Sequence, residues 1–344
     1  MSRRAAAAEA LARLPRADLA ARPTPLHRGP DLPSGARLLI KRDDLTGLGL
    51  GGNKARKLEL LCGEALAAGA DTLVTVGAAQ SNHARMTAAA GAVLGLEVEL
   101  VLGGEAPAEP AGNQLLAERF GARLHHQDTD DWAELAGALA TLAERIEHEG
   151  RRPFAIPMGG STERGAAGYL AAWFELLDQL GGTRPAAIVH ASSTGGTHAG
   201  LLAGRALWAA DGEPAPDVIA IDVAKAPGDL AINAVHLARG ALDLAGAQDV
   251  AIAAELVEVD GRWAGPAYAE PTAAGDRAIA WAGEHAGLVL DRVYTGKALA
   301  GLLGLDEAGR FGPGDTVVFC HTGGHPAVFA PGGSPSVQPH KELV

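Results

Sequence analysis

A lysine that directly follows a run of glycines is the first residue of this chain whose setting suggests chemistry. Lys54 closes the segment GLGLGGNK (47–54), and an amphipathic helical pattern follows it. The lysine would lie in the first helical turn, where the macrodipole is already positive. Burial there would lower the pKa of the amine, and such an amine can be a Schiff-base nucleophile. The alternative is a solvated surface lysine, which is also the interpretation of Lys57.

The segment GAAQSNHARMTAAA (77–90) places polar residues at an expected helix start. Ser81 or Asn82 has the character of an N-cap residue, and His83 follows directly. Free backbone N–H groups at a helix N-terminus bind anions, so the segment could receive a carboxylate. Plain helix capping is the alternative.

The segment SSTGGTHAGLL (192–202) lies between an expected buried strand and an expected helix. Thr194, Gly195, Gly196 and Thr197 could surround a phosphate with backbone N–H groups and two hydroxyls. No lysine follows the glycines, and the spacing is not that of a dinucleotide-binding loop. A monophosphate therefore fits this segment better than a triphosphate. The alternative is a tight turn between strand and helix.

Three more candidates come from the second half of the chain. Thr322, in CHTGGHP (320–326), could hydrogen-bond a ligand or take part in a turn. Tyr268 in GPAY and Tyr294 in VYTGK are two of only three tyrosines, with packing or capping as the alternative role. Neighbouring strand residues such as Cys320 and His321 face opposite sides, and the histidines lack metal-type spacing. No metal site is predicted.

The composition restricts the class of protein. A chain of 344 residues fits two domains, and 29 basic against 41 acidic residues give a net charge of −12. This acidic balance argues against a nucleic acid or an anionic membrane as partner. No apolar run approaches the roughly 18 residues of a membrane span. Only Cys62 and Cys320 are present, which favours a reducing cytoplasm.

The elements that must position these residues alternate along the chain. Apolar runs at 72–76, 98–102, 186–191 and 217–223 read as buried strands, and long Ala/Leu-rich helical patterns follow them. The last strand is expected within 316–324, and the N-terminal stretch is expected to form a surface helix or arm. This alternation predicts an α/β fold with mainly parallel, twisted sheets flanked by helices.

Two glycine- or proline-rich stretches, 41–54 and 149–170, are candidate crossings between domains. They predict a small domain over 47–164. They also predict a larger domain built from 1–46 and 165–344.

Taken together, these segments resemble a known family. RDDLTGLGLGGNKARKLE, GAAQSNHARMTAAA, TGGTHAGL, VYTGKALAGL and HTGG occur in the order found in pyridoxal-phosphate (PLP) enzymes of the ACC deaminase/D-cysteine desulfhydrase family. The resemblance covers roughly residues 20–330. It implies the tryptophan-synthase-β-like fold, PLP as cofactor, a small amino-acid substrate and a homodimer.

The resemblance also implies roles for the residues. Lys54 matches the lysine that forms the internal aldimine with PLP, and Asn82 matches the residue at the phenolic oxygen. Ser81 and His83 match residues facing the substrate carboxylate. Ser81 is also expected to be a catalytic residue, together with Lys54, Tyr268 and Tyr294. The remaining matches are the phosphate loop, the two active-site tyrosines and the group at the pyridine nitrogen, namely Thr194, Gly195, Gly196, Thr197, Tyr268, Tyr294 and Thr322.

Three positions favour the D-cysteine desulfhydrase branch. Deaminases typically read VYEGK, HLGG and QSNQTR where this chain has Thr295, Thr322 and QSNHAR. The expected reaction is therefore β-elimination, most simply of D-cysteine to pyruvate, hydrogen sulfide and ammonia. L-Cysteate sulfo-lyase activity, ACC deamination and non-catalytic binding of PLP or an amino acid are the alternatives. One segment, GPAYAEPT, lacks the glycines that usually flank the tyrosine, which leaves the substrate open.

Overall fold

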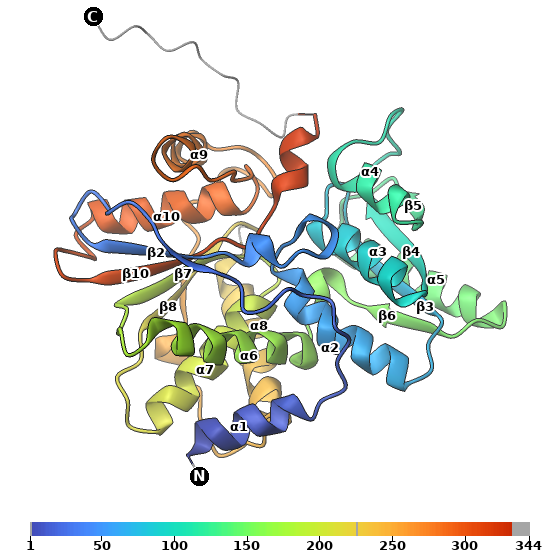
Figure 1. Cartoon of the computed structure of the whole chain (residues 1–344). Helices are drawn as coiled ribbons and strands as arrows, with labels where there is room; N and C mark the ends of the chain where they lie inside the picture. Colours follow the sequence, from blue (N-terminus) through green and yellow to red (C-terminus); the bar gives the residue numbers. More distant parts are fainter. Residues whose placement is uncertain (1, 225, 332–344) are drawn as a thin grey trace, which may run out of the picture.

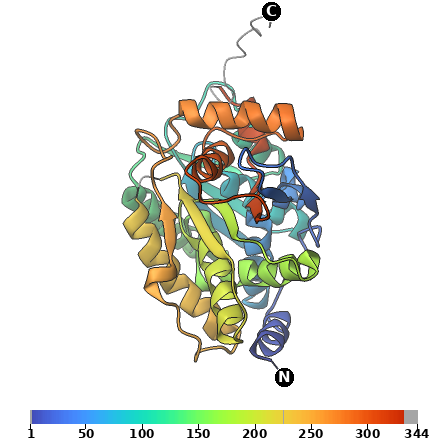
Figure 2. The same cartoon turned by 90° about the vertical axis from the view of Figure 1, so that its left-hand side faces the viewer.

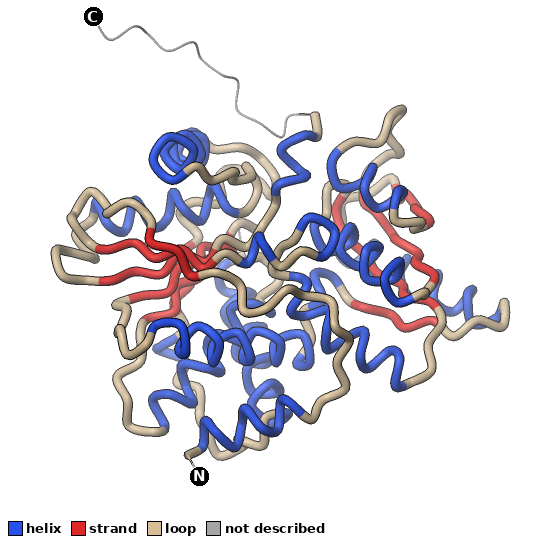
Figure 3. Tube along the Cα trace, in the orientation of Figure 1, coloured by secondary structure: helices blue, strands red, loops and turns tan. Residues whose placement is uncertain are grey.

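Two separate sheets organise the molecule. The computed structural model describes residues 2–224 and 226–331, and it shows the sheets side by side with helices on their faces (Figure 1). The two groups of strands are also distinct in Figure 3, where loops and helix ends occupy the space between them.

The larger sheet has six strands in the order β1-β2-β10-β7-β8-β9. The β1–β2 pair is antiparallel, and every other pair in this sheet is parallel. Its strands are β1 (Leu26–Arg28), β2 (Arg37–Lys41), β7 (Ala187–Ser192), β8 (Asp217–Asp222), β9 (Glu258–Asp260) and β10 (Thr316–Cys320).

Helices cover both faces of this sheet (Figure 2). One face packs on α6 (Glu163–Leu180), α7 (Gly196–Ala210) and α8 (Pro227–Leu244), and α1 (Arg3–Ala12) packs on these helices. The other face packs on α9 (Ala273–Ala286) and α10 (Thr295–Glu307). Along β10, Val318 and Cys320 join the first core while Val317 and Phe319 join the second. A strand buried on both faces needs this unbroken apolar run.

The smaller sheet has four strands in the order β5-β4-β3-β6, all parallel. They are β3 (Thr72–Ala78), β4 (Glu97–Gly103), β5 (Arg123–Gln127) and β6 (Pro153–Ile156). On one face lie α2 (Lys54–Ala67), α3 (Asn82–Leu94) and α4 (Gly112–Arg119), and on the other lies α5 (Trp132–His148). Short 3-10 helices complete the chain at η1 (Asp43–Leu45), η2 (Leu48–Leu50), η3 (Met158–Gly160), η4 (Ala254–Leu256) and η5 (His325–Phe329).

The predicted α/β fold is confirmed, and the strands expected from apolar runs appear as β3, β4, β7, β8 and β10. The last strand is shorter than 316–324, because it ends at Cys320 and the glycines after it belong to a loop. Strands β1, β2, β5, β6 and β9 carry no predicted counterpart. β5 and β9 are edge strands with polar sequences, RLHHQ and EVD, so hydrophobic patterning could not reveal them.

The described helices include none that is long and apolar enough to cross a membrane. The expected N-terminal surface helix is α1, which buries Ala7 and Leu11 against α6, α7 and α8. The boundaries of the two predicted domains stay a prediction, and residues 332–344 of the larger one lie outside the described residues.

Candidate active site

The carboxyl-terminal ends of strands from both sheets border one cavity. The segments after β3, β6, β7 and β10 contribute to its wall, together with the first turns of α2, α5 and α10. The cavity brings together all of the predicted site residues, namely Lys54, Ser81, Asn82, His83, Thr194, Gly195, Gly196, Thr197, Tyr268, Tyr294 and Thr322.

Lys54 is the first residue of α2, as expected, and its amine points into this cavity. Nζ lies 3.4 Å from the carbonyl oxygen of Gly159. Burial lowers the pKa of the Lys54 amine to about 8. At neutral pH a useful fraction of this amine is therefore unprotonated, as a nucleophile or proton acceptor requires.

The interpretation of Lys57 as a surface lysine is wrong, because this lysine is only 1% exposed. Its Nζ donates to the carbonyl oxygen of Gly159 at 3.1 Å and to Ser161 Oγ at 3.2 Å. Lys54 and Lys57 thus share one acceptor. Burial, and then the charge of Lys54, lower the pKa of Lys57 well below its usual value. One turn of helix separates the two residues, so both amines reach the same side of α2.

The loop before α7 forms a cradle that suits an anion. No side chain caps this helix, and Gly195 occupies its N-cap position with φ +84°. A Cβ at Gly196 would lie 2.7 Å from both Lys57 Nζ and Ser161 Oγ, so a side chain here would displace the amine and the hydroxyl. Ser161 Oγ also accepts from Gly196 N at 3.3 Å and lies 2.7 Å from Thr194 Oγ1. The cradle therefore combines helix N–H groups, hydroxyls and a buried amine.

Asn53 connects α2 to this cradle, although it does not cap the helix with its side chain. Its Nδ2 donates to Thr197 Oγ1 at 3.0 Å, and its backbone N donates to Thr322 O at 3.0 Å. The segment before Lys54 is therefore held to the first turn of α7 and to the loop after β10.

The predicted helix start at α3 is confirmed, with Ser81 as N-cap and its Oγ accepting from Ala84 N at 3.1 Å. Asn82 and His83 are the next two residues, whose N–H groups have no partner within an α-helix. Asn82 Oδ1 accepts from Asn113 Nδ2 at 3.1 Å, and Asn113 N in turn donates to Gln80 Oε1. The orientation of Asn82 is thus fixed from α4.

The hydrogen bonds of His83 determine where its ring proton lies. Thr75 Oγ1 donates its only proton to Ile156 O at 2.7 Å, so it accepts from His83 Nε2 at 3.0 Å. His83 Nδ1 is left as a buried acceptor without a protein partner among the described residues. Burial, and then the charges of Lys54 and Lys57, lower the pKa of His83 well below its usual value. A neutral ring in this tautomer offers the cavity a lone pair.

Tyr268 and Tyr294 form a hydrogen-bonded pair of hydroxyls on the opposite wall. Burial, and then the neighbouring Tyr268, raise the pKa of Tyr294 well above its usual value, so it keeps its proton. Thr295 does not reach the cavity. Its hydroxyl donates to Asp291 Oδ1 at 2.8 Å, and the same carboxylate accepts from the backbone N of Tyr294. Asp291 therefore positions Tyr294 at the start of α10.

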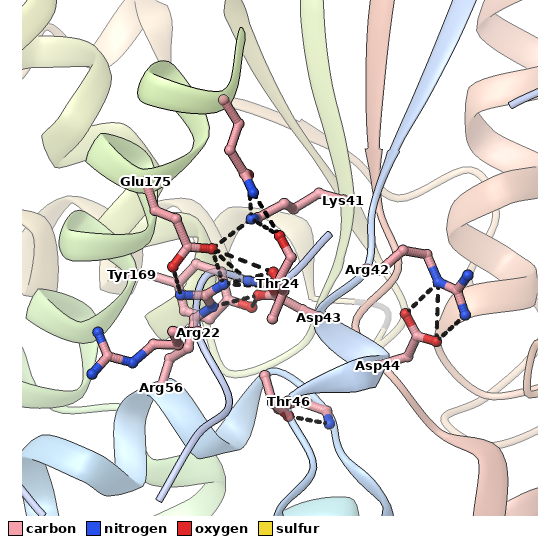
Figure 4. Close-up of polar contacts among 12 residues, drawn as sticks. Arg22, Thr24, Lys41, Arg42, Asp43, Asp44, Thr46, Arg56, Tyr169 and Glu175 are labelled. Atoms are coloured by element: carbon pink, nitrogen blue, oxygen red, sulfur yellow. Dashed lines mark hydrogen bonds and ion pairs between the residues drawn. The ribbon is translucent and has the colours of Figure 1, made fainter. Parts of the chain in front are cut away.

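A network of buried charges holds the other side of α2 (Figure 4). The Arg56 guanidinium donates to both carboxylate oxygens of Asp43 at 2.8 Å, and it also reaches Glu175 and Thr24. Burial opposes the charge on Asp43, but Arg56 outweighs it and lowers the pKa of that carboxyl. Arg56 is two residues beyond Lys54, so this network fixes the helix that carries the reactive amine.

Asp44, His321 and His325 form a cluster with ligand-type atoms within 4.8 Å of one another. Arg42 Nη2 already occupies Asp44 Oδ2 at 2.6 Å. Gly323 N donates to His321 Nδ1, which leaves the proton of a neutral ring on Nε2, the atom nearest to Asp44. The nearest nitrogens of His321 and His325 lie 3.9 and 3.7 Å from Asp44 Oδ2, which is longer than a hydrogen bond. The absence of a metal stays a prediction.

Most of the chain matches a known protein family. Residues 17–323 match the model of the family described as pyridoxal-phosphate dependent enzymes. The chain belongs to this family.

The PLP-enzyme family includes relatives that cover most of this chain. A D-cysteine desulfhydrase of Klebsiella pneumoniae (strain 342) is 39% identical over 330 residues, or 93% of this chain and 97% of that protein. The crystal structure of an ACC deaminase homologue matches with a TM-score of 0.85 and 37% identity over 94% of this chain and 96% of that one. A fungal L-serine ammonia-lyase from Rhizomucor miehei shares the fold, with a TM-score of 0.64 and 20% identity over 90% and 95%.

The cavity fits the cofactor of the PLP-enzyme family. A buried amine with a pKa of about 8 faces a cradle of helix N–H groups and hydroxyls that suits one phosphate. The unpartnered acceptor His83 Nδ1 and the unpartnered Ser192 Oγ lie in the same lining. Groups left without a protein partner in a buried wall are expected where a polar ligand supplies the partner.

Sequence patterns missed several residues of this PLP site. Ser161, Asn113 and Trp132 support or line the cavity, but none of them belongs to a motif that pointed to chemistry. Lys57 lies within the segment RDDLTGLGLGGNKARKLE, but it was expected at the surface. Ser161 follows two glycines in the segment PMGGST, which is the one local signal that could have marked it as a ligand loop.

Proposed function

We propose that this chain catalyses the β-elimination of a small β-substituted amino acid, with D-cysteine as the substrate. The products are pyruvate, hydrogen sulfide and ammonia, with one water consumed. The observation that carries this proposal is a single cavity with the buried Lys54 amine and the paired hydroxyls of Tyr268 and Tyr294 in its wall. The identity to relatives named D-cysteine desulfhydrase supports it.

The charges of the lining favour this substrate over L-cysteate. Among the described residues that border the cavity, none is arginine, aspartate or glutamate, and the lysines are Lys54 and Lys57. A sulfonate would need its own cation, whereas the thiol of cysteine needs only a polar or proton-bearing neighbour. Deamination of ACC and binding without catalysis remain outcomes that the assay below distinguishes.

Each residue acts through a stated atom. Lys54 Nζ is the group that attaches the cofactor and then accepts the proton from the substrate Cα. When bound, PLP supplies the electron sink that stabilises the negative charge developing at Cα. The backbone N–H groups of Asn82 and His83, with the Ser81 hydroxyl, bind the substrate carboxylate at the start of α3. The imidazole itself has no proton facing the cavity, so the backbone of His83 is its contribution.

The leaving group requires a proton at sulfur. The Tyr294 hydroxyl keeps its proton because its pKa is raised, so it can donate to the departing thiolate or hydrogen-bond it. Tyr268 shares the hydrogen bond and orients that proton. From the family resemblance, the Thr322 hydroxyl would hold the pyridine nitrogen and Asn82 would hold the phenolic oxygen. A neutral Thr322 keeps the ring less electron-withdrawing than a carboxylate partner would.

The segment Thr194–Thr197 would hold the phosphate, and its Thr194 hydroxyl contacts Ser161 Oγ, which in turn accepts from Lys57 Nζ. We further propose that the protein is a cytoplasmic homodimer. The resemblance to its family and the two buried, unpaired cysteines support this assignment.

A panel of β-substituted amino acids tests the reaction. Purified protein loaded with PLP should release pyruvate and sulfide from D-cysteine faster than from its L-enantiomer. Release of 2-oxobutyrate from ACC would show that ACC is the substrate in place of D-cysteine. Release of sulfite from L-cysteate would show the same for L-cysteate. Bound PLP without turnover across the panel would support the binding protein instead.

The pH dependence of cofactor capture tests the lowered pKa of Lys54. Only the unprotonated amine reacts, so the rate at which apoenzyme acquires the cofactor's visible absorption should rise with pH to a midpoint near 8. An ordinary lysine would keep gaining rate towards about 10.4. Stopped-flow measurements above pH 7, where the phosphate no longer titrates, give this profile. A rate still rising steeply above pH 9 would contradict the lowered pKa.

Lys57 is expected to contribute to cofactor affinity rather than to the chemical step. In the variant Lys57→Met the affinity for PLP should fall about 10- to 100-fold, because a charged hydrogen bond contributes roughly 1.5–3 kcal/mol. At saturating PLP the variant should keep kcat within about threefold. Equilibrium dialysis measures the affinity. Unchanged affinity would show that Lys57 has only a packing role.

A further inference from the structure

An aromatic contact crosses the outer margin of the cavity. Trp132 is the first residue of α5, on the side of the smaller sheet, and Tyr268 belongs to the loop 261–272 after β9 of the larger sheet. The two rings meet edge to face, with centroids 5.5 Å apart and planes at 76°. Both rings line the cavity, yet Trp132 is 40% exposed. Trp132 therefore stands between the cavity and solvent.

The row of rings continues towards the centre of the site. Tyr268 and Tyr294 lie 6.2 Å apart in a second edge-to-face contact, and their hydroxyls are hydrogen-bonded. The rings are in contact in the order Trp132, Tyr268, Tyr294, with Trp132 exposed and both tyrosines half-buried. A group that extends from the Tyr294 hydroxyl along this row passes Tyr268 and meets Trp132.

Trp132 is held in place by its own segment. Asp131 caps α5, with Oδ1 accepting from Ala133 N at 2.8 Å and from Glu134 N at 3.0 Å. The loop before it is tied to the end of β4, since Gly104 N donates to Thr129 O at 3.1 Å. The indole thus projects from a fixed helix start and not from a free loop.

The loop that carries Tyr268 is also fixed. The buried Lys297 Nζ donates to Ala264 O at 2.6 Å, and Thr272 caps α9 at the other end of the loop. Ala269, next to Tyr268, has φ +63°, a conformation that favours glycine. A strained residue of this kind persists only where surrounding contacts determine it, and such residues cluster at functional sites. The contacts of the Tyr268 ring with Trp132 and Tyr294 are among those that hold this part of the loop.

We propose that Trp132 and Tyr268 form a barrier that limits the size of the leaving group on the substrate's β-carbon. This rests on the proposed function, which places the departing sulfur at the Tyr294 hydroxyl. A bare thiol ends before the Trp132–Tyr268 barrier, whereas an S-alkyl substituent has to occupy the space of the indole. The barrier selects free cysteine over its thioethers and makes Trp132 a specificity-determining residue.

Relative turnover of cysteine and S-ethylcysteine tests the barrier, with pyruvate as the common product. For the enantiomer that is cleaved, Trp132→Ala should raise the kcat/KM ratio of thioether to free thiol by about tenfold or more. Trp132→Phe, which keeps a ring, should change this ratio less than about threefold. Phe329→Ala is the matched control, because Phe329 is 78% exposed and lies outside the lining. An unchanged ratio in Trp132→Ala would overturn the proposal.

A binding series separates this proposal from the proposed reaction. Alanine, 2-aminobutyrate, norvaline and norleucine carry no leaving group, and their affinities can be followed through the absorption of the bound cofactor. Wild-type affinity should fall as the side chain lengthens, and this fall should flatten in Trp132→Ala. If neither cysteine enantiomer is cleaved, the reaction is wrong but a flattened series still supports the barrier. Identical series in both proteins would overturn it.

Discussion

Replacing Lys54 by alanine is expected to abolish the visible absorption of the bound cofactor and to reduce turnover at least ~10³-fold. The physical reason is that the variant loses both the covalent attachment point and the base that accepts the Cα proton. Parallel spectra and pyruvate-release assays on wild-type and variant protein at equal concentration measure the two effects. Folding should be intact, because alanine is a good residue for the first turn of α2.

Two comparisons distinguish lost chemistry from a disturbed cavity. Lys54→Arg keeps a positive charge without a usable amine, so it should be as inactive as the alanine variant. An added small amine such as methylamine should restore part of the turnover of Lys54→Ala, since the freed space lies in the cavity wall. A Lys54→Ala enzyme that keeps more than a tenth of wild-type turnover would contradict the assignment.

Removing the Arg56 side chain is expected to have the largest effect on stability. Arg56 is 2% exposed and Asp43 is 1% exposed, so Arg56→Met leaves a buried carboxylate without its main partner. Loss of one member of a buried ion pair costs about 3–5 kcal/mol. The free energy of unfolding of the apoenzyme, measured by denaturant titration, should fall by this amount. The apoenzyme is the appropriate form, because bound cofactor would add its own stabilisation.

Matched variants make this prediction specific to burial. Arg13 pairs with Glu9 on the exposed face of α1, and Arg13→Ala should cost less than about 0.5 kcal/mol. The double variant Arg56→Met with Asp43→Asn should recover part of the loss, since it removes the stranded charge. If Arg56→Met and Arg13→Ala destabilise equally, the network of Figure 4 does not hold α2 in the manner described.

Lys54→Ala and Arg56→Met both act on α2, which links stability to function. α2 presents Lys54 to the cavity and Arg56 to the larger sheet within three residues. A loosened α2 in Arg56→Met should therefore also weaken cofactor binding, although no atom of Arg56 borders the cavity.

The sequence by itself determined the class of fold and the residues at the strand ends. The runs that became β3, β4, β7, β8 and β10 are mainly apolar, because a central parallel strand is buried on both faces. Lys54, Ser81 and Thr194–Thr197 lie in short glycine-containing segments at helix starts, a local signal that needs no tertiary information. Ligands collect at the carboxyl ends of such strands, so these residues could be grouped before the structure was known.

Only the tertiary structure decided which polar groups are buried and what they contact. Lys57, Arg56 and Arg85 are charged residues on helical segments, and nothing in their local sequence marks them as buried. Asn53 meets Thr197, 144 positions away, and Arg56 meets Glu175, 119 positions away. A sequence pattern reports neighbours within a few residues, whereas the cost of burying a charge depends on partners that only folding brings near. The contact between Trp132 and Tyr268, which come from different sheets, belongs to the same class.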